Sequence, residues 1–198
     1  MSQRGVRAQQ REQTRRALLR ESRQLFAAQG YGAVGLAQIV EAAGVTKGAL
    51  YHHFDSKADL FGAVLEEVQR EVGRRVAAAA EAHADRWDQL TAGCREFLAV
   101  TAEPDIQRIM LVDGPAVLGW SAWRALDEAS SAQHLGDALA ALVAEGTLPP
   151  QPVEPLTHLL SGAMNEAALW LASPSGPADP AETWAALERL LRALRHTG

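Results

Sequence analysis

The stretch GVTKGALYHHF, residues 44–54, decides the fold of this chain. Gly44 ends one helical pattern, because glycine adopts the left-handed backbone conformation without a Cβ clash. Thr46 then suits the N-cap of a new helix, where its side-chain oxygen accepts a hydrogen bond from a free backbone amide. That helix is predicted to cover only residues 47–53 and to bury Leu50. The stretch therefore predicts a tight turn followed by a short helix with little apolar bulk.

Two helices are predicted before this turn. One face recurs at Leu18, Ser22, Leu25 and Phe26, with the spacing of a helix that packs on a core. A second, shorter helix is predicted over residues 36–43. Two short helices joined through a glycine turn are typical of a helix-turn-helix.

The outer face of the helix after the turn suits a DNA major groove. It presents Lys47, Gly48 and Ala49, which are slim or charged, to a groove about 12 Å wide. A glycine costs roughly 1 kcal/mol against alanine inside a helix, and close approach to a phosphate or a base edge would justify it. Tyr51 and His52 can donate hydrogen bonds to phosphate oxygens, unless Tyr51 packs on the following helix.

With these residues the sequence resembles the TetR family of bacterial transcriptional repressors. Over about residues 14–61 the resemblance is carried, in register, by Phe26, Gly30, Tyr31, Leu36, Ile39, residues 43–51, His53, Phe54, Ser56, Lys57 and Leu60. It implies a homodimer of all-α subunits that binds a double-stranded palindromic DNA operator. It also implies that a small-molecule effector, held in the carboxy-terminal domain, releases the DNA.

The resemblance assigns roles residue by residue. The implied DNA contacts are Thr46, Lys47, Gly48, Ala49, Tyr51, His52 and Lys57, with Lys47 against a base and most of the others against phosphates. The family often has a Thr/Ser pair at the start of its second helix, where this chain has Val34 and Gly35. A hydroxyl that caps the helix and touches phosphate is therefore missing, and only backbone amides near Gly35 remain for such a contact.

Charge is distributed unevenly along the chain, whose formal net charge is -5. Residues 1–60 hold nine Lys/Arg and five Asp/Glu, a net of +4, whereas the remainder holds ten and nineteen, a net of -9. This asymmetry indicates that the amino-terminal region meets a polyanion, although chance clustering on a solvated tail gives the same count. Arg4, Arg7 and Arg11 either reach the DNA as an arm or belong to a disordered tail.

The remaining composition indicates a cytoplasmic protein. The single cysteine, Cys94, excludes an internal disulfide framework and fits a reducing compartment. The amino end lacks the apolar segment of a signal peptide, and no apolar run approaches the roughly 18 residues of a membrane span. We therefore expect no membrane partner.

We expect an all-α chain of about nine helices with three regions. These are a flexible basic arm (1–13), a helix-turn-helix DNA-binding domain (14–60) and a ligand-binding and dimerisation domain (61–198). Within the last of these regions, a helix is predicted to break at residues 113–115, Asp-Gly-Pro, and a long helix to follow over residues 116–145.

The carboxy-terminal region carries predictions for the dimer interface and for the effector pocket. Apolar stripes on two final helices predict a four-helix interface from Leu156, Leu160, Ala163, Ala167, Leu171, Trp184, Leu187, Leu191 and Leu194. One stripe must also serve as internal core, so which residues cross the two-fold axis stays open. The predicted pocket residues are Phe97, Arg108, Met110, Asp113, Trp120, Trp123, Met164, Asn165 and Trp170.

Other classes of function find less support in the sequence. Cys94, His83, Asp113, His134 and His158 form no spaced catalytic motif, so we expect no enzyme. We expect no cofactor and no metal, because the adjacent His52 and His53 point about 100° apart on a helix and chelate poorly. The alternative is a helical dimeric interaction scaffold without specific DNA binding, which the missing hydroxyls at residues 34–35 favour.

Overall fold

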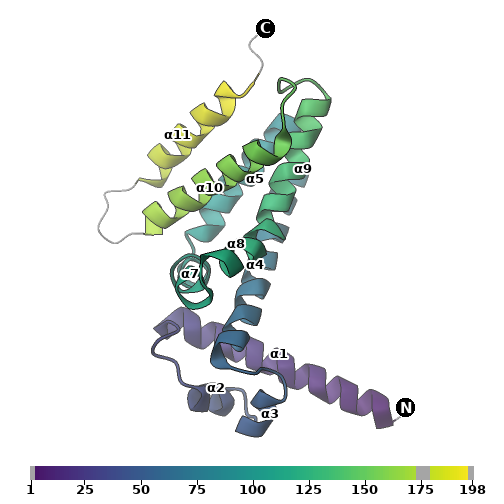
Figure 1. Ribbon diagram of the computed structural model, residues 1–198, viewed down its shortest axis with the longest axis vertical. Coiled ribbons are helices and arrows are strands. Elements are labelled where there is room, and N and C mark those ends of the chain that lie inside the picture. The colour runs from purple at the N-terminus through teal and green to yellow at the C-terminus, as the bar shows by residue number, and fades with distance from the viewer. Residues whose placement is uncertain (1–2, 173–178, 196–198) are drawn as a thin grey trace.

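The computed structural model describes residues 3–172 and 179–195, and over these ranges the chain is helical throughout, with no strand (Figure 1). The elements are α1 (Gln3–Gln29), α2 (Leu36–Ala42), α3 (Lys47–Tyr51), α4 (Lys57–Glu81), α5 (Arg86–Thr101), α6 (Pro104–Ile106), the π-helix η1 (Gln107–Asp113), α7 (Gly114–Leu118), α8 (Trp120–Glu128), α9 (Ser131–Ala144), α10 (Val153–Ala172) and α11 (Pro180–Ala193). The predicted all-α class is confirmed.

We call α1–α3 the head. Its core is formed by Phe26, Ile39 and Leu50, none of which is exposed to solvent. Gly44 turns the chain between α2 and α3 with φ +65°, the left-handed conformation that the sequence predicts. Thr46 caps α3, and its Oγ1 accepts a hydrogen bond from the backbone amide of Ala49 at 3.2 Å. Local chemistry therefore fixes where the short helix after the turn begins.

Helix α4 connects the head to α5–α11, which we call the body. It begins beside α3, where Ser56 Oγ accepts a hydrogen bond from the Asp59 amide at 3.0 Å, and rises out of the head into the body (Figure 1). Val64, Val68 and Val72 form a fully buried stripe along it. Because α4 packs on α1 at one end and on α5 and α9 at the other, head and body share one rigid element.

The amino-terminal residues differ from the prediction. The sequence predicts a flexible arm over residues 1–13, whereas α1 already begins at Gln3 and runs without a break to Gln29. Polar residues without an apolar face still extend a helix once its packed carboxy-terminal half has supplied the nucleus, because each added residue then gains one hydrogen bond. Residues 3–13 are therefore part of α1, where the sequence predicts an arm.

The segment after α5 also differs. Residues 113–115 do not break a helix: η1 continues directly into α7, and Pro115 lies in the first turn of α7. The break comes at Gly119, with φ +80°, so the long helix predicted over residues 116–145 is divided into α7, α8 and α9. Gly114 is required by packing, because a Cβ there would lie 2.9 Å from Cδ1 of Trp123.

In the body, α5 and α9 pack on the upper half of α4, α10 packs on α5 and α9, and α11 lies outermost against α5 and α10 (Figure 1). Leu139, Leu142 and Val100 are fully buried between these helices. Among the helices that the structure describes, none has the length and apolar character to cross a membrane.

Gly44→Ala tests the turn that sets the angle between α2 and α3. Open space surrounds the position, so the substitution meets no clash, but an L-residue at φ +65° costs about 1–2 kcal/mol. We expect the free energy of unfolding in urea to fall by about that amount. Gly32→Ala is the matched control, since Gly32 has equal space and no positive φ. Equal stability of the two variants would contradict the role assigned to Gly44.

Candidate nucleic-acid interface and effector cavity

The outer face of α3 is free of intramolecular packing. Lys47 and Gly48 are exposed, and the side chain of Tyr51 is 48% exposed. Lys47 Nζ lies 6.0 Å from the centroid of the Tyr51 ring, so the cation and the aromatic ring share one side of the helix. Tyr51 therefore does not pack on the following helix, and it keeps its hydroxyl available to a partner.

Gly48 has no reason to be glycine within the chain itself. A Cβ at this position would meet only Thr46 Oγ1, at 3.9 Å, and the residue is helical without a positive φ. A glycine inside a helix costs roughly 1 kcal/mol against alanine. Since the fold does not require this glycine, close approach of another molecule is the physical reason that remains.

A basic groove runs between the first turns of α1 and the end of α3, and the sequence analysis missed it. It is lined by Arg7, Gln10, Arg11, Gln13 and Thr14 of α1 and by Ala49, His52 and His53. Burial, reinforced by the charges of Arg11, His52 and Arg15, lowers the pKa of His53. The groove is basic because the helical form of α1 holds Arg7 and Arg11 beside α3. No helical periodicity in residues 1–13 indicated this arrangement.

The start of α2 presents backbone without a capping side chain. Gly35 is the exposed N-cap of α2 and makes no side-chain hydrogen bond, as the sequence indicates. Val34 is 1% exposed and belongs to the core of the head. Any contact to phosphate here is left to backbone amides.

Lys57 lies at the junction of head and body and not on the open face of the head. The sequence predicts a phosphate contact, whereas Lys57 Nζ donates to the Tyr31 carbonyl at 2.5 Å and lies 4.1 Å from the Tyr31 ring centroid. Burial lowers the pKa of Lys57, and the nearby Asp113 opposes that shift. The half-buried ammonium group already has a hydrogen-bond partner within the chain, because Tyr31, in the turn after α1, lies over it.

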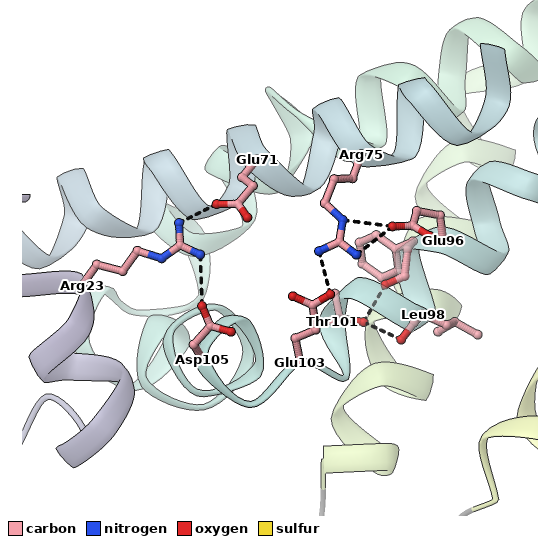
Figure 2. A network of polar contacts seen from close by, with 9 residues as sticks. Arg23, Glu71, Arg75, Glu96, Leu98, Thr101, Glu103 and Asp105 are labelled. Atoms are coloured by element: carbon pink, nitrogen blue, oxygen red, sulfur yellow. Dashed lines mark hydrogen bonds and ion pairs between the residues drawn. The ribbon is translucent and has the colours of Figure 1, made fainter. Parts of the chain in front are cut away.

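We call this junction the joint. Besides Lys57 and Tyr31 it contains two sets of contacts, one centred on Arg23 and one on Arg75. Arg23 of α1 donates to Glu71 of α4 and, at 3.1 Å, to Asp105 of α6 (Figure 2). One turn further along α4, Arg75 bridges Glu96 and Glu103 in the same way (Figure 2). The first arginine ties head to body, and the second ties α4 to α5 and the segment after it.

Arg108 and Asp113, which the sequence analysis predicts as ligand anchors, make contacts in the joint. Asp113 Oδ2 accepts a hydrogen bond from the Tyr31 amide at 2.8 Å, and Arg108 donates to the Gln29 carbonyl at 3.4 Å. Both side chains come from η1 and hold the turn that follows α1. Sequence patterns contained no sign of this, because the two segments are 79 or more residues apart.

A cavity of about 60 Å³ lies in the body between α4, α5, α9 and α10. Val76, Leu90, Phe97, Leu135 and Met164 contribute to its walls. Cys94 also lines it, and burial raises the pKa of its thiol to about 12, so the sulfur is a protonated, apolar wall atom.

Only some of the predicted pocket residues line this cavity. Phe97 and Met164 do, whereas Met110 and Trp123 are packed together in the core, with Trp123 Nε1 donating to the Met110 carbonyl at 2.7 Å. Trp120 and Trp170 are 62% and 50% exposed and face away from the interior. Aromatic side chains favour burial, but the position of each residue around its helix determines whether the side chain points into the core or towards solvent.

Asn165, predicted as a pocket residue, belongs to a buried polar cluster and does not line the cavity. Oδ2 of Asp127 accepts hydrogen bonds from Asn165 Nδ2 at 3.0 Å, from Ser161 Oγ at 3.1 Å and from Arg124 Nη1 at 3.0 Å. Burial raises the pKa of Asp127 and outweighs these donors, which act in the opposite direction. Asn165 Oδ1 is buried without a partner.

The predicted dimer stripes are largely internal core. Leu156, Leu160, Leu187 and Leu191 are each less than 10% exposed within a single subunit. Ala167, Leu171, Trp184 and Leu194 are half-buried, and Ala163 is exposed. The exposed apolar residues of α10 and α11 are Leu159, Trp170 and Leu190, at 72%, 50% and 59%, and the sequence analysis missed all three. Their spacing from Ala163 on α10 was the available signal, since residues 159, 163 and 170 share a helical face.

Comparison with known proteins supports this division of the chain. The family model for bacterial regulatory proteins of the tetR family matches residues 18–64, and a model for a tetracyclin repressor-like carboxy-terminal domain matches residues 87–194. A solved TetR-family transcriptional regulator from Pectobacterium atrosepticum is 34% identical, with a TM-score of 0.80 over 94% of this chain and 96% of that chain. RolR, solved in complex with resorcinol, is 22% identical, with a TM-score of 0.73 over 94% of this chain and 90% of that chain, and shares the fold.

Curated relatives match mainly through the head. The transcriptional regulator AcrR of Shigella flexneri is 40% identical over 65 residues, which are 33% of this chain and 30% of that protein. The transcriptional activator FasR of Mycolicibacterium smegmatis is 36% identical over 93 residues, 47% of this chain and 34% of that protein. The alignments thus span about a third of the length of these relatives.

The substitution Gly48→Ala distinguishes the effect of this residue on stability from its effect on DNA binding. We expect the free energy of unfolding to rise by about 0.5–1 kcal/mol, because alanine is the better helix former and the site has room for a methyl group. We also expect duplex DNA to be bound more weakly, because the methyl group projects from the outer face of α3. Gly62→Ala is the control: its Cβ meets Leu118 at 3.8 Å, an ordinary contact within the fold. A Gly48→Ala variant with unchanged DNA affinity would contradict the assignment of this face.

Proposed function

Because the chain belongs to the TetR family of bacterial regulatory proteins, we propose that it is a transcriptional repressor that binds a palindromic DNA operator as a homodimer. A small molecule held in the body releases it from the operator. The observation that carries the proposal is the outer face of α3, where Lys47, Gly48 and Tyr51 are exposed beside the electropositive groove of α1.

The chemistry of this face fits a duplex. The slim residues at the start of α3 allow its backbone to approach the base edges of a major groove, and Lys47 supplies a donor for guanine. Arg7 and Arg11 flank α3 and suit phosphates or the neighbouring minor groove. Binding to the polyanion should therefore be strongly dependent on salt.

A second copy of the chain is the partner that best fits the exposed apolar face of α10 and α11. Leu159 and Trp170 of α10 and Leu190 of α11 are exposed, and the exposed Gly162 and Ala163 allow close approach of a facing helix. A two-fold pair formed through this face presents two copies of α3. Operators for such dimers place their half-sites about 34–36 Å apart, or a multiple of that distance.

The proposed release acts through α4 and the joint. The cavity lies along the upper half of α4. Lower on the same helix, Glu71 accepts a hydrogen bond from Arg23, and Asp113 of η1 accepts one from the Tyr31 amide. A ligand that binds better when α4 is displaced shifts the population towards that state by its difference in affinity. The spacing of the two α3 helices then no longer fits successive grooves.

Selection of bound duplexes from a random pool tests the DNA-binding function. We expect an enriched palindrome, and affinity for it should fall with salt at a slope of about -0.9 per neutralised phosphate. Lys47→Ala should cost about 1–3 kcal/mol of discrimination at one base position in each half-site. Gln133→Ala, on the exposed side of α9, is the control and should bind as the wild type does. Recovery of no enriched sequence, with no retention by any duplex at low salt, would show that the protein is not a sequence-specific DNA-binding protein.

Leu159→Glu tests the dimer. A charge placed on the most exposed leucine of α10 would be buried without a partner in the proposed interface, so we expect sedimentation at micromolar concentration to shift from dimer to monomer. Operator affinity should fall as well, since a monomer binds only one half-site. Gln133→Glu adds the same charge on α9 and should remain dimeric. A dimeric Leu159→Glu variant would place the interface elsewhere.

A further inference from the structure

We propose that one sugar-phosphate strand of the operator lies in the groove between α1 and α3, and that His53 binds it as an imidazolium cation, so that operator binding takes up a proton. The inference rests on the proposed function and deepens it, because it names the part of the DNA that the groove holds and a pH dependence that follows. Three observations carry it: the donors that line the groove, its continuity with the outer face of α3, and the position of His53.

Hydrogen-bond donors cover the side of α1 that faces the groove. In the helical form of α1, four groove residues share one face, namely Arg7, Gln10, Arg11 and Thr14. Glu12, the only acidic residue among residues 3–20, lies on the opposite side of the helix, where it pairs with Arg16 at 2.7 Å. A helix face that carries donors and positive charge, and no carboxylate, suits a polyanion.

The groove adjoins the face of α3 that is proposed to enter the major groove. With about 100° between successive helix residues, His52 lies about 40° from Gly48 around α3, and Ala49 lies about 60° further on. His52 and Ala49 both line the groove. A helix with its side chains is about 10–12 Å across and fills a major groove about 12 Å wide, so a phosphate strand runs along each side of it. The strand on the side of α1 therefore meets the donors of the groove.

His53 lies in this groove with its imidazole available to a ligand. The residue is half-buried, its ring centroid lies 5.8 Å from that of His52, and among the described residues no side chain forms a hydrogen bond with it. Burial lowers the pKa of His53, the charges of Arg11, His52 and Arg15 lower it further, and the charge of Glu12 opposes them. In the free protein the imidazole is therefore mainly neutral at pH 7.

A phosphate in the groove reverses this balance. An opposite charge within about 4–6 Å favours the charged form of a titratable group, and the same phosphate offsets the charges of the neighbouring arginines. The pKa of His53 is then higher in the complex than in the free protein, so the complex binds more protons. Operator affinity therefore rises as the pH falls from the pKa of His53 in the complex to its pKa in the free protein, and His53 has no effect on the pH dependence outside that interval.

Operator affinity measured as a function of pH at constant ionic strength tests the proposal. We expect the dissociation constant to fall by up to about tenfold for each unit by which the pH falls, the slope for one proton, and calorimetry in two buffers of different ionisation enthalpy to register the uptake. His53→Gln keeps a hydrogen-bond donor but takes no proton, so it should lose most of both effects. His83→Gln, at an exposed position beyond the end of α4, is the matched control. No proton uptake by the wild type, or a slope that His53→Gln leaves intact, would overturn the proposal.

The imidazole resonances of the wild-type protein provide a second measurement that does not depend on a variant. The resonance of His53 should titrate at a higher pH in the operator complex than in the free protein. Millimolar inorganic phosphate added without DNA should shift that titration much less than the duplex does, because a single anion is not held along the groove by the donors of α1. If inorganic phosphate shifts it as far as the duplex does, the groove is a general anion site and the assignment to a DNA strand is wrong.

Two arginine variants compare the two sides of α1. Arg11→Gln should weaken binding to all duplexes about equally and reduce the salt slope by about one. It should also raise the pKa of His53 in the free protein, because it removes a charge that lowers that pKa. Arg16→Gln removes the same charge on the exposed, opposite side of α1 and should do neither. Equal effects of the two variants would show that α1 acts through net charge alone and not through the groove.

Selection from the random pool keeps this inference separate from the proposed function. If an operator is enriched but its binding takes up no proton, the role of His53 is wrong and the regulatory function stands. If duplexes are bound with proton uptake at His53 but no sequence is enriched, sequence-specific regulation is wrong and the groove assignment stands, because phosphate contacts do not depend on sequence. Failure to bind any duplex would refute both.

Discussion

The continuity of α4 is the physical constraint on which the rest of the structure depends. Its 25 residues form one helix of about 37 Å, capped by Ser56 beside α3 and ending between the helices of the body. The buried stripe from Val64 to Val72 packs against the head at one end and the body at the other. Because a packed helix moves as a rigid element, the displacement proposed at the cavity would be transmitted to the position of α3.

The joint is built mainly from polar contacts, and this suits a movable connection. Arg23, Lys57 and Asp113 are each half-buried; Arg23 and Asp113 have partners across the boundary between head and body, and Lys57 ties the start of α4 to the turn after α1. Exposed or half-exposed ion pairs contribute little net stability, about 0–1 kcal/mol each, so they can be exchanged at low cost. The apolar cores on either side hold their shape, and the polar layer between them permits sliding. The seven-residue π-helix η1, of a type that is rare in proteins and frequent at functional sites, supplies Asp113 to this layer.

The sequence predicted the head well and the details of the body poorly, for physical reasons. Gly44 and Thr46 act within a few residues of the chain, so their spacing fixes the turn and the cap without knowledge of the rest. Leu156 and Leu159 are both apolar on one helix, and only the packing of α9 and α11 decides which is core and which is surface. Lys57 illustrates a third limit, because its partner Tyr31 lies 26 residues away in a loop with no sequence pattern.

Two residues near α4 lower the stability of the free protein. One lies on α3, beside the start of α4, and the other lies on α4 inside the body. Gly48, beside its start, has room for a methyl group, and Gln69, inside the body, buries an amide without partners. Each costs about 1 kcal/mol or more, and neither is required by the geometry of the fold. A partner that approaches closely explains the first, as proposed for the outer face of α3. Gly48 thus marks a surface at which the subunit is incomplete by itself, and α4 is the element that connects this surface to the body.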